Sequence, residues 1–162
     1  MDFRALRILL VVAAVFAAVI DGCYRQGESQ EPQVTIGSAN WKVVIADTSS
    51  QRYQGLSGRA ALADDRGMLF IYPRPAVLRF VMRNCSIPLD IAFIDSSRRV
   101  TRIYTMEVEP DLAGREVYTS GTEAQYALEV VAGALGRAGV QVGDYVKFSK
   151  SIPPATKAEE GP

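Results

Sequence analysis

The sequence contains no histidine, and this absence excludes several kinds of site. Ser-His-Asp and Cys-His nucleophilic sites, imidazole zinc sites and histidine-ligated haem all require an imidazole side chain. Cysteine is scarce as well, since Cys23 and Cys85 alone give neither a metal-ligand spacing nor a disulfide framework. Any catalysis therefore depends on carboxylates, lysine, tyrosine or Cys85, and we expect no cofactor and no metal ion.

An excess of charge of one sign is also missing, because 18 Lys and Arg residues balance 18 Asp and Glu residues. A protein that binds nucleic acid through its phosphates presents a basic surface. We therefore expect no nucleic-acid partner. With 162 residues and 48% hydrophobic content, the chain is long enough for one folded domain with appendages.

The apolar run at residues 8–20 is too short for a membrane span, which needs about 20 residues. It follows Arg4 and Arg7 and precedes a polar stretch, which is the pattern of a signal peptide. We therefore predict a signal peptide over residues 1–22 and export of the mature protein to the cell envelope.

Residues 20–23, Ile-Asp-Gly-Cys, resemble the lipobox of bacterial lipoproteins, in which the cysteine is acylated and becomes the first residue. Asp21 departs from that pattern, because a small uncharged residue is usual there. The resemblance implies a lipid on Cys23 that anchors the protein to the membrane on its extracytoplasmic side. The alternatives are a cleaved signal peptide without a lipid, an uncleaved anchor, and an ordinary thiol at Cys23.

The remaining sequence predicts a tether over residues 23–39, a single β-rich domain over 40–150 and a disordered tail over 151–162. Within the domain, apolar runs and alternating patterns predict about seven short strands and one or two short helices. Thr48, Ser49 and Ser50 are cap residues that predict a short helix over residues 50–54, and Gly55 suits its C-terminal end. We expect a mostly β fold, either a compact antiparallel sandwich or a small, partly open barrel. Pro73 and Pro75 are expected to end one strand, and residues 107–122 to form a long loop.

Residues 79–95 form the centre of the predicted fold. Two apolar runs, at 80–82 and 89–94, flank a polar corner at 83–86. The second run is apolar on both faces, which is typical of a strand that is covered from both sides. Because the corner holds most of the chemically active side chains of this stretch, we predict a binding site beside residues 83–90.

The candidate site residues are Arg59, Met82, Asn84, Asp90 and Glu129. Asp90 begins a buried strand, so it either accepts backbone N–H bonds at the corner or faces a cleft as a ligand group. Arg59 is either its ion-pair partner or a planar donor for an anionic ligand. Asn84 is a turn residue or a binding group, and Met82 is expected to pack in the core beside it.

Glu129 lies between Leu128 and Val130 in a strand pattern, so its side chain points to the face opposite theirs. Either that face is solvated, or Glu129 converges with Asp90 as a carboxylate pair suited to acid-base chemistry. Cys85 lacks an activating histidine and is expected to be an inert thiol.

Several segments, taken in order, resemble the family catalogued as domain of unknown function 192. They are residues 54–59, 65–70, 80–85 with 87–91, and 128–130 with 132–133 and 143–144, so the resemblance covers residues 41–148. It implies a small, mostly β protein of a family whose members are often exported or lipid-anchored and have no established activity. The sequence departs from the family at Val81, where Trp is usual, and at Cys85, where Thr is usual, so an aromatic wall at this corner is not implied.

Two functional hypotheses follow. The first is a non-catalytic, exported and lipid-anchored envelope domain that binds an unidentified ligand or partner beside residues 83–90. The second is a small hydrolase or lyase that uses Asp90 and Glu129, with Arg59 as an anion clamp. A third possibility, support of a larger assembly, would need an exposed apolar patch on the strand of Trp41. The site hypothesis predicts that Arg59, Asn84 and Asp90 line one hollow.

Overall fold

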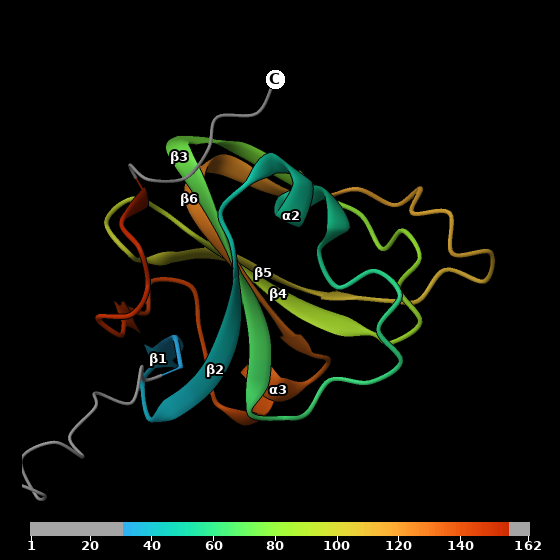
Figure 1. The fold of residues 1–162 in the computed structure, drawn as a ribbon. Helices are drawn as coiled ribbons and strands as arrows, with labels where there is room; N and C mark the ends of the chain where they lie inside the picture. Colours follow the sequence, from blue (N-terminus) through green and yellow to red (C-terminus); the bar gives the residue numbers. More distant parts are fainter. Residues whose placement is uncertain (1–30, 156–162) are drawn as a thin grey trace, which may run out of the picture. The chain divides into compact units, whose positions relative to one another are not determined.

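The computed structural model describes residues 31–155, and the predicted signal peptide and the lipid site at Cys23 lie outside these residues. The described chain is mostly β, with one seven-stranded sheet in the order β5-β4-β6-β3-β2-β1-β7 (Figure 1). The strands are β1 (Gln33–Ile36), β2 (Ala39–Ala46), β3 (Arg66–Phe80), β4 (Leu89–Ile94), β5 (Val100–Met106), β6 (Tyr118–Val131) and β7 (Val146–Phe148). The helices are α2 (Ser49–Gln54) and α3 (Ala134–Arg137). No helix within residues 31–155 has the length and apolar character of a membrane span.

The sheet curls into a half-barrel, which confirms the predicted fold class. Its two ends are joined by backbone hydrogen bonds, in which Val146 N donates to Arg98 O (2.9 Å) and Val100 N donates to Asp144 O (3.0 Å). The strand pairs are antiparallel except for β2 and β3, which run parallel. A parallel pair needs a crossover of about a dozen residues or more, and residues 47–65, which include α2, supply it.

The sheet has an apolar cluster on each face, because successive residues of a strand point to opposite sides. We call the first the α3 face; it includes Leu128 and Val130 of β6 and Leu135 of α3. We call the second the α2 face; it includes Ala127 of β6 and Leu56, which follows α2 in the chain. The two helices lie well apart in Figure 1, near the ends of different strands. β4 is buried along its whole length, as the apolar run on both of its faces predicted.

The prolines and the predicted loop require corrections. β3 continues through Pro73 and Pro75, but its pairing with β6 shifts register between Ile71 and Ala76. The prolines thus lie where the hydrogen-bond ladder is interrupted, which is where proline is tolerated in a sheet. The loop predicted over 107–122 is shorter than expected because β6 begins at Tyr118.

The predicted domain boundaries are also too narrow. β1 pairs with both β2 and β7, so it belongs to the sheet and not to a tether. Ile152 and Ala155 are 9% and 8% exposed and pack on the α3 face, so residues 151–155 are not a disordered tail. Residues 156–162, the rest of the predicted tail, lie outside the described residues.

The helix α2 forms where the sequence predicted it. Thr48 Oγ1 accepts a hydrogen bond from Gln51 N (3.2 Å), and the Gln51 side chain accepts one from Thr48 N (3.0 Å), which together form a capping box. Gly55 follows the last helical residue with a φ of 51°, a conformation that glycine adopts without a steric penalty. This short helix carries Tyr53 to the rim of the hollow described next.

Candidate functional site

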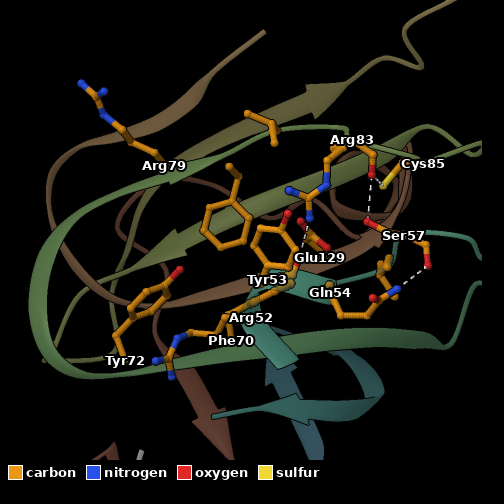
Figure 2. Close-up of a pocket in the computed structure, with 14 residues that line it drawn as sticks. Arg52, Tyr53, Gln54, Ser57, Phe70, Tyr72, Arg79, Arg83, Cys85 and Glu129 are labelled. Carbon is orange, nitrogen blue, oxygen red and sulfur yellow. Dashed lines mark hydrogen bonds between the residues drawn. The ribbon is translucent and has the colours of Figure 1, made fainter. Parts of the chain in front are cut away.

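A hollow of about 160 Å³ lies on the α2 face, between α2, the second half of β3 and the polar corner. The apolar part of its wall is formed by Leu56, Phe70 and Phe80. The side chain of Glu129 reaches the hollow from β6 (Figure 2). The hollow therefore combines an apolar wall with polar and charged groups, and Glu129 is the single carboxyl among its lining residues. We call it the Glu129 hollow.

Glu129 is buried by its position in the sheet. It pairs with Met68 of β3 and with Ile91 of β4, so its side chain shares their α2 face. Only 5% of the residue is exposed, and within residues 31–155 its carboxyl has no hydrogen-bond or ion-pair partner, so the carboxyl oxygens border the hollow. Burial raises the pKa of this carboxyl from 4.5 to about 8, because the charged form loses its hydration. At neutral pH the group is mostly a neutral acid.

The solvated outer face predicted as one alternative for Glu129 is wrong. The alternation of Leu128, Glu129 and Val130 predicts that Glu129 lies on the other face of the strand, which is correct. The alternation of residues within one strand does not show whether that face is buried. Here the face is buried by residues such as Leu56 and Phe70, which are distant from Glu129 in the sequence.

Arg83 and Tyr53 form one side of the hollow. The Arg83 guanidinium lies 3.9 Å from the centre of the Tyr53 ring, and Arg83 Nη2 donates to Tyr53 O (2.7 Å). Ser57 Oγ donates to Arg83 O (2.8 Å), so the corner is tied to the segment that follows α2 (Figure 2). Tyr53 as a whole residue is 72% exposed. Arg83 is thus held at the rim by the same segment that carries Tyr53.

Arg52 and Tyr72 form the opposite side. Arg52 Nη1 donates to Asp47 O (2.7 Å) and to Ile71 O (3.0 Å), and its guanidinium lies 4.9 Å from the centre of the Tyr72 ring. Burial raises the pKa of Tyr72, a shift that the Arg52 charge opposes and the Glu129 charge reinforces. Tyr72 is therefore a neutral phenol at neutral pH.

Cys85 also lines the hollow but is poorly suited to act as a nucleophile. Burial raises the pKa of its thiol, and the charge of Glu129 adds to this, whereas a hydrogen bond with Ser57 and the charge of Arg83 oppose it. The thiol thus stays protonated at neutral pH, which agrees with the prediction of an inert cysteine.

Asp90 lies on the α3 face. It pairs with Thr105 of β5 and with Val130 of β6. Its carboxylate accepts hydrogen bonds from Thr105 Oγ1 (2.7 Å) and from Leu135 N (3.0 Å). It therefore binds a backbone N–H, as one alternative predicted, but the N–H belongs to α3 and not to the corner.

The carboxylate pair of the second hypothesis is consequently wrong. Asp90 and Glu129 point to opposite faces of the same sheet, so the backbone of β4 and β6 separates them. The hydrolase or lyase mechanism based on this pair has no site in the molecule.

The other three predicted residues do not line the Glu129 hollow either. Arg59 is exposed in a separate groove with Lys42 and Arg66, and it forms no ion pair with Asp90. Asn84 is a turn residue with a φ of 52°; its N donates to Leu112 O (2.8 Å), and its O accepts from Gly58 N (2.8 Å). Met82 is 1% exposed in the core of the α2 face. The common hollow of Arg59, Asn84 and Asp90 was thus a wrong prediction.

The sequence contained a signal for the observed hollow that residue-by-residue reasoning missed. Each family-like segment contributes lining residues, which are Gln54 to Ser57 from the first, Phe70 from the second, Phe80, Val81, Arg83 and Cys85 from the third, and Glu129 from the fourth. Segments scattered along the chain therefore converge on one place. No group of three or more His, Cys, Asp or Glu residues suited to hold a metal ion occurs within residues 31–155.

Comparisons with known proteins agree with this architecture. The family model DUF192, described as "Uncharacterized ACR", matches residues 32–148. A protein of unknown function from Novosphingobium aromaticivorans DSM 12444 shares 31% identity, with a TM-score of 0.66 over 71% of this chain and 83% of that one. A protein from Sinorhizobium meliloti 1021 described as a "putative transcription regulator" shares 27% identity. Its TM-score is 0.62, and the match covers 72% of this chain and 92% of that one. No match was found among curated proteins.

Proposed function

This chain belongs to the domain of unknown function 192 family, and from this we propose that it is a non-catalytic, exported and lipid-anchored envelope module that binds a small ligand in the Glu129 hollow. The binding site remains next to the corner at 83–86, since Arg83 and Cys85 line the hollow. Its other residues differ from those predicted from the sequence.

The Glu129 carboxyl is the observation that carries the proposal. No buried side-chain nitrogen or oxygen atom within residues 31–155 lacks a hydrogen-bond partner. Glu129 is 5% exposed and its carboxyl has no protein partner among these residues, so the carboxyl opens into the hollow that it lines. A ligand that enters the hollow would therefore meet a polar group that the protein itself does not use.

A binding role fits the hollow better than catalysis does. Cys85 and Tyr72 are both protonated at neutral pH, and Asp90 lies on the far side of the sheet. Glu129 therefore has no second carboxylate and no thiolate beside it with which to divide the roles of acid and nucleophile.

Export and anchoring rest on the sequence of residues 1–23. Mass spectrometry of the mature N-terminus tests them directly, because an acylated Cys23 adds the mass of its lipid. We expect the wild-type protein in the membrane fraction and the Cys23→Ser variant outside it. An unmodified mature chain that retains residues 1–22, or a Cys23→Ser variant that stays in the membrane fraction, would contradict the lipid anchor.

Blocking the mouth of the hollow tests the binding role. Val81 lines the hollow and is 37% exposed, and the family resemblance implies that the fold accommodates Trp there. We expect full-length Val81→Trp protein, immobilised and exposed to a metabolite extract, to retain at least about tenfold less of the compound that the wild type retains. Val77→Trp is the matched control, because Val77 is 52% exposed on β3 and does not line the hollow. Equal retention by the wild type and both variants would refute the site.

A further inference from the structure

We infer that the Glu129 hollow takes a small organic carboxylate with an apolar body about the size of a six-membered ring, which bonds to the Glu129 carboxyl and faces the arginines of the rim. This inference rests on the proposed binding function and adds the chemical class of the ligand. Size, charge and hydrogen bonding each support it.

The size of the hollow limits the part of the ligand that it holds. Its volume of about 160 Å³ is close to that of engineered protein cavities of about 150 Å³, which bind benzene. The walls formed by Leu56, Phe70 and Phe80 suit an apolar ring, since edge and face contacts with aromatic side chains are favourable. A larger ligand would place one such group inside and extend into the solvent past Tyr53.

The charge of the lining favours an anion. The titratable and charged side chains around the hollow are Arg52 and Tyr53 from α2, Tyr72 and Arg79 from β3, Arg83 and Cys85 from the corner, and Glu129 from β6. Arg79 and Arg83 contribute guanidinium groups, which are positively charged, and Arg52 is tied to backbone oxygens beside the hollow. The only carboxyl is buried and mostly neutral at pH 7, so the lining is positively charged and repels a cationic ligand.

The hydrogen-bonding groups also match a carboxylate. The acid form of Glu129 has an O–H donor that the protein leaves unused within residues 31–155, and an O–H donor to a carboxylate forms a short, strong bond. Arg83 uses Nη2 for Tyr53 O, and its guanidinium has further N–H groups available. Arg79 also lines the hollow, but Figure 2 shows its guanidinium pointing away from Glu129, so Arg79 contributes charge at a distance.

The same donor makes binding depend on pH. Below about pH 8 Glu129 carries the proton that the ligand needs, and above it the ionised Glu129 repels the ligand carboxylate. Linkage then requires the affinity to fall by about tenfold per pH unit above pH 8, as long as the bound state keeps the proton. Burial raises the pKa of Tyr72 and of Cys85, so neither group produces this dependence at a lower pH.

The test uses the full-length protein and three ligands of nearly equal shape. Benzoate, benzamide and benzylammonium carry a negative, a neutral and a positive group on the same ring. Binding is followed by the amide NMR signals of Gly55 and Ser57, which line the hollow, up to about 10 mM ligand, the range expected for compounds of this size. We expect benzoate to bind at least about tenfold more tightly than the other two at pH 7.

Variants separate the role of the proton from that of the fold. Glu129→Gln keeps a hydrogen-bond donor but cannot ionise, so it should bind benzoate at pH 7 and lose the decrease above pH 8. Arg79→Gln should weaken benzoate binding about threefold or more by removing a charge at an exposed position. Arg59→Gln, an exposed arginine in another groove, should leave binding unchanged.

The possible results distinguish this inference from the proposed function. Stronger binding of benzamide or benzylammonium at the hollow would overturn the carboxylate inference and leave the binding function intact. A Glu129→Gln variant that retains the pH dependence would overturn the role of Glu129 as the donor. If none of the three compounds moves the signals of the hollow, both the inference and the proposed site are wrong.

Discussion

Asp90 and Glu129 lie on neighbouring strands and point to opposite faces of the sheet, because Asp90 pairs with Val130 and Glu129 pairs with Ile91. Each carboxyl thus has its own environment. Asp90 accepts two hydrogen bonds that fasten α3 and β5, whereas Glu129 makes none within residues 31–155 and borders a hollow. One is a structural group, and the other is available to a ligand.

Replacement of Asp90 should lower stability without affecting the hollow. In Asp90→Ala the N–H of Leu135 and the hydroxyl of Thr105 lose their acceptor, which should reduce the free energy of unfolding by about 3 kcal/mol. Urea denaturation measures this loss. Asp95→Ala is the control, because Asp95 makes a comparable but exposed bond to Arg99 N (2.8 Å) and should cost about 1 kcal/mol or less. Equal losses in the two variants would show that Asp90 has no special structural role.

Glu129 should make the folded domain less stable as the pH rises. Its pKa is raised from 4.5 to about 8 by burial, so the folded state holds the proton more tightly than the unfolded state. The resulting stabilisation is complete below pH 4.5, decreases up to about pH 8 and is constant above that. By linkage the change is roughly 5 kcal/mol.

The Glu129→Gln variant isolates this contribution, because glutamine does not titrate. The stability of the variant relative to the wild type should therefore increase between pH 5 and pH 8, as measured by urea denaturation at several pH values. A difference between the two proteins that stays constant over this range would mean that Glu129 is ionised in the folded state at ordinary pH.

Cys85 should react slowly with alkylating reagents. It is 5% exposed, and burial raises the pKa of its thiol, so few folded molecules present a thiolate. At pH 7.5 we expect alkylation of Cys85 by iodoacetamide, followed on its peptide by mass spectrometry, to be at least about tenfold slower in folded than in urea-unfolded protein. Similar rates in both states would indicate an accessible and activated thiol.

Gly67 should tolerate no larger side chain. A Cβ atom there would lie 2.6 Å from Glu129 O and 3.0 Å from Val130 Cγ1, so Gly67→Ala must push β3 away from β6. We expect a loss of about 2–3 kcal/mol in the free energy of unfolding. Gly136→Ala is the matched control, because its Cβ would meet nothing within 4 Å and alanine favours the helix by up to about 1 kcal/mol. A loss at Gly136 as large as that at Gly67 would refute the steric explanation.

Local patterns were sufficient to predict much of the fold. The fully apolar run at Leu89–Ile94 is the buried strand β4, and Thr48 and Gly55 bound the short helix as their cap positions predicted. Such features depend on residues close together in the sequence. β1 and the segment with Ile152 were assigned outside the domain, because their order comes from pairing and packing with distant residues.

The site was harder to predict for the same reason. Asn84 and Asp90 are candidates because they lie at the corner in sequence, and Arg59 is one because its charge complements that of Asp90. Neither charge nor proximity in sequence determines the face of the sheet on which a side chain lies. The strand register places Glu129 over the hollow, and α2 brings Tyr53 to its rim. A sequence pattern shows which residues of a strand alternate between its two faces. The pairing register with neighbouring strands, and the burial of each face, are determined only in the assembled sheet.

The position of β1 has a mechanical consequence. β1 is hydrogen-bonded to β2 on one side and to β7 on the other, and Gln33 N also donates to Ser149 Oγ (2.9 Å). Any pulling force on the chain before Gln33 therefore enters the domain along a strand clamped between two neighbours. Such a load is shared by several backbone bonds in shear, so this edge of the sheet is among the places where the domain best resists forced unfolding.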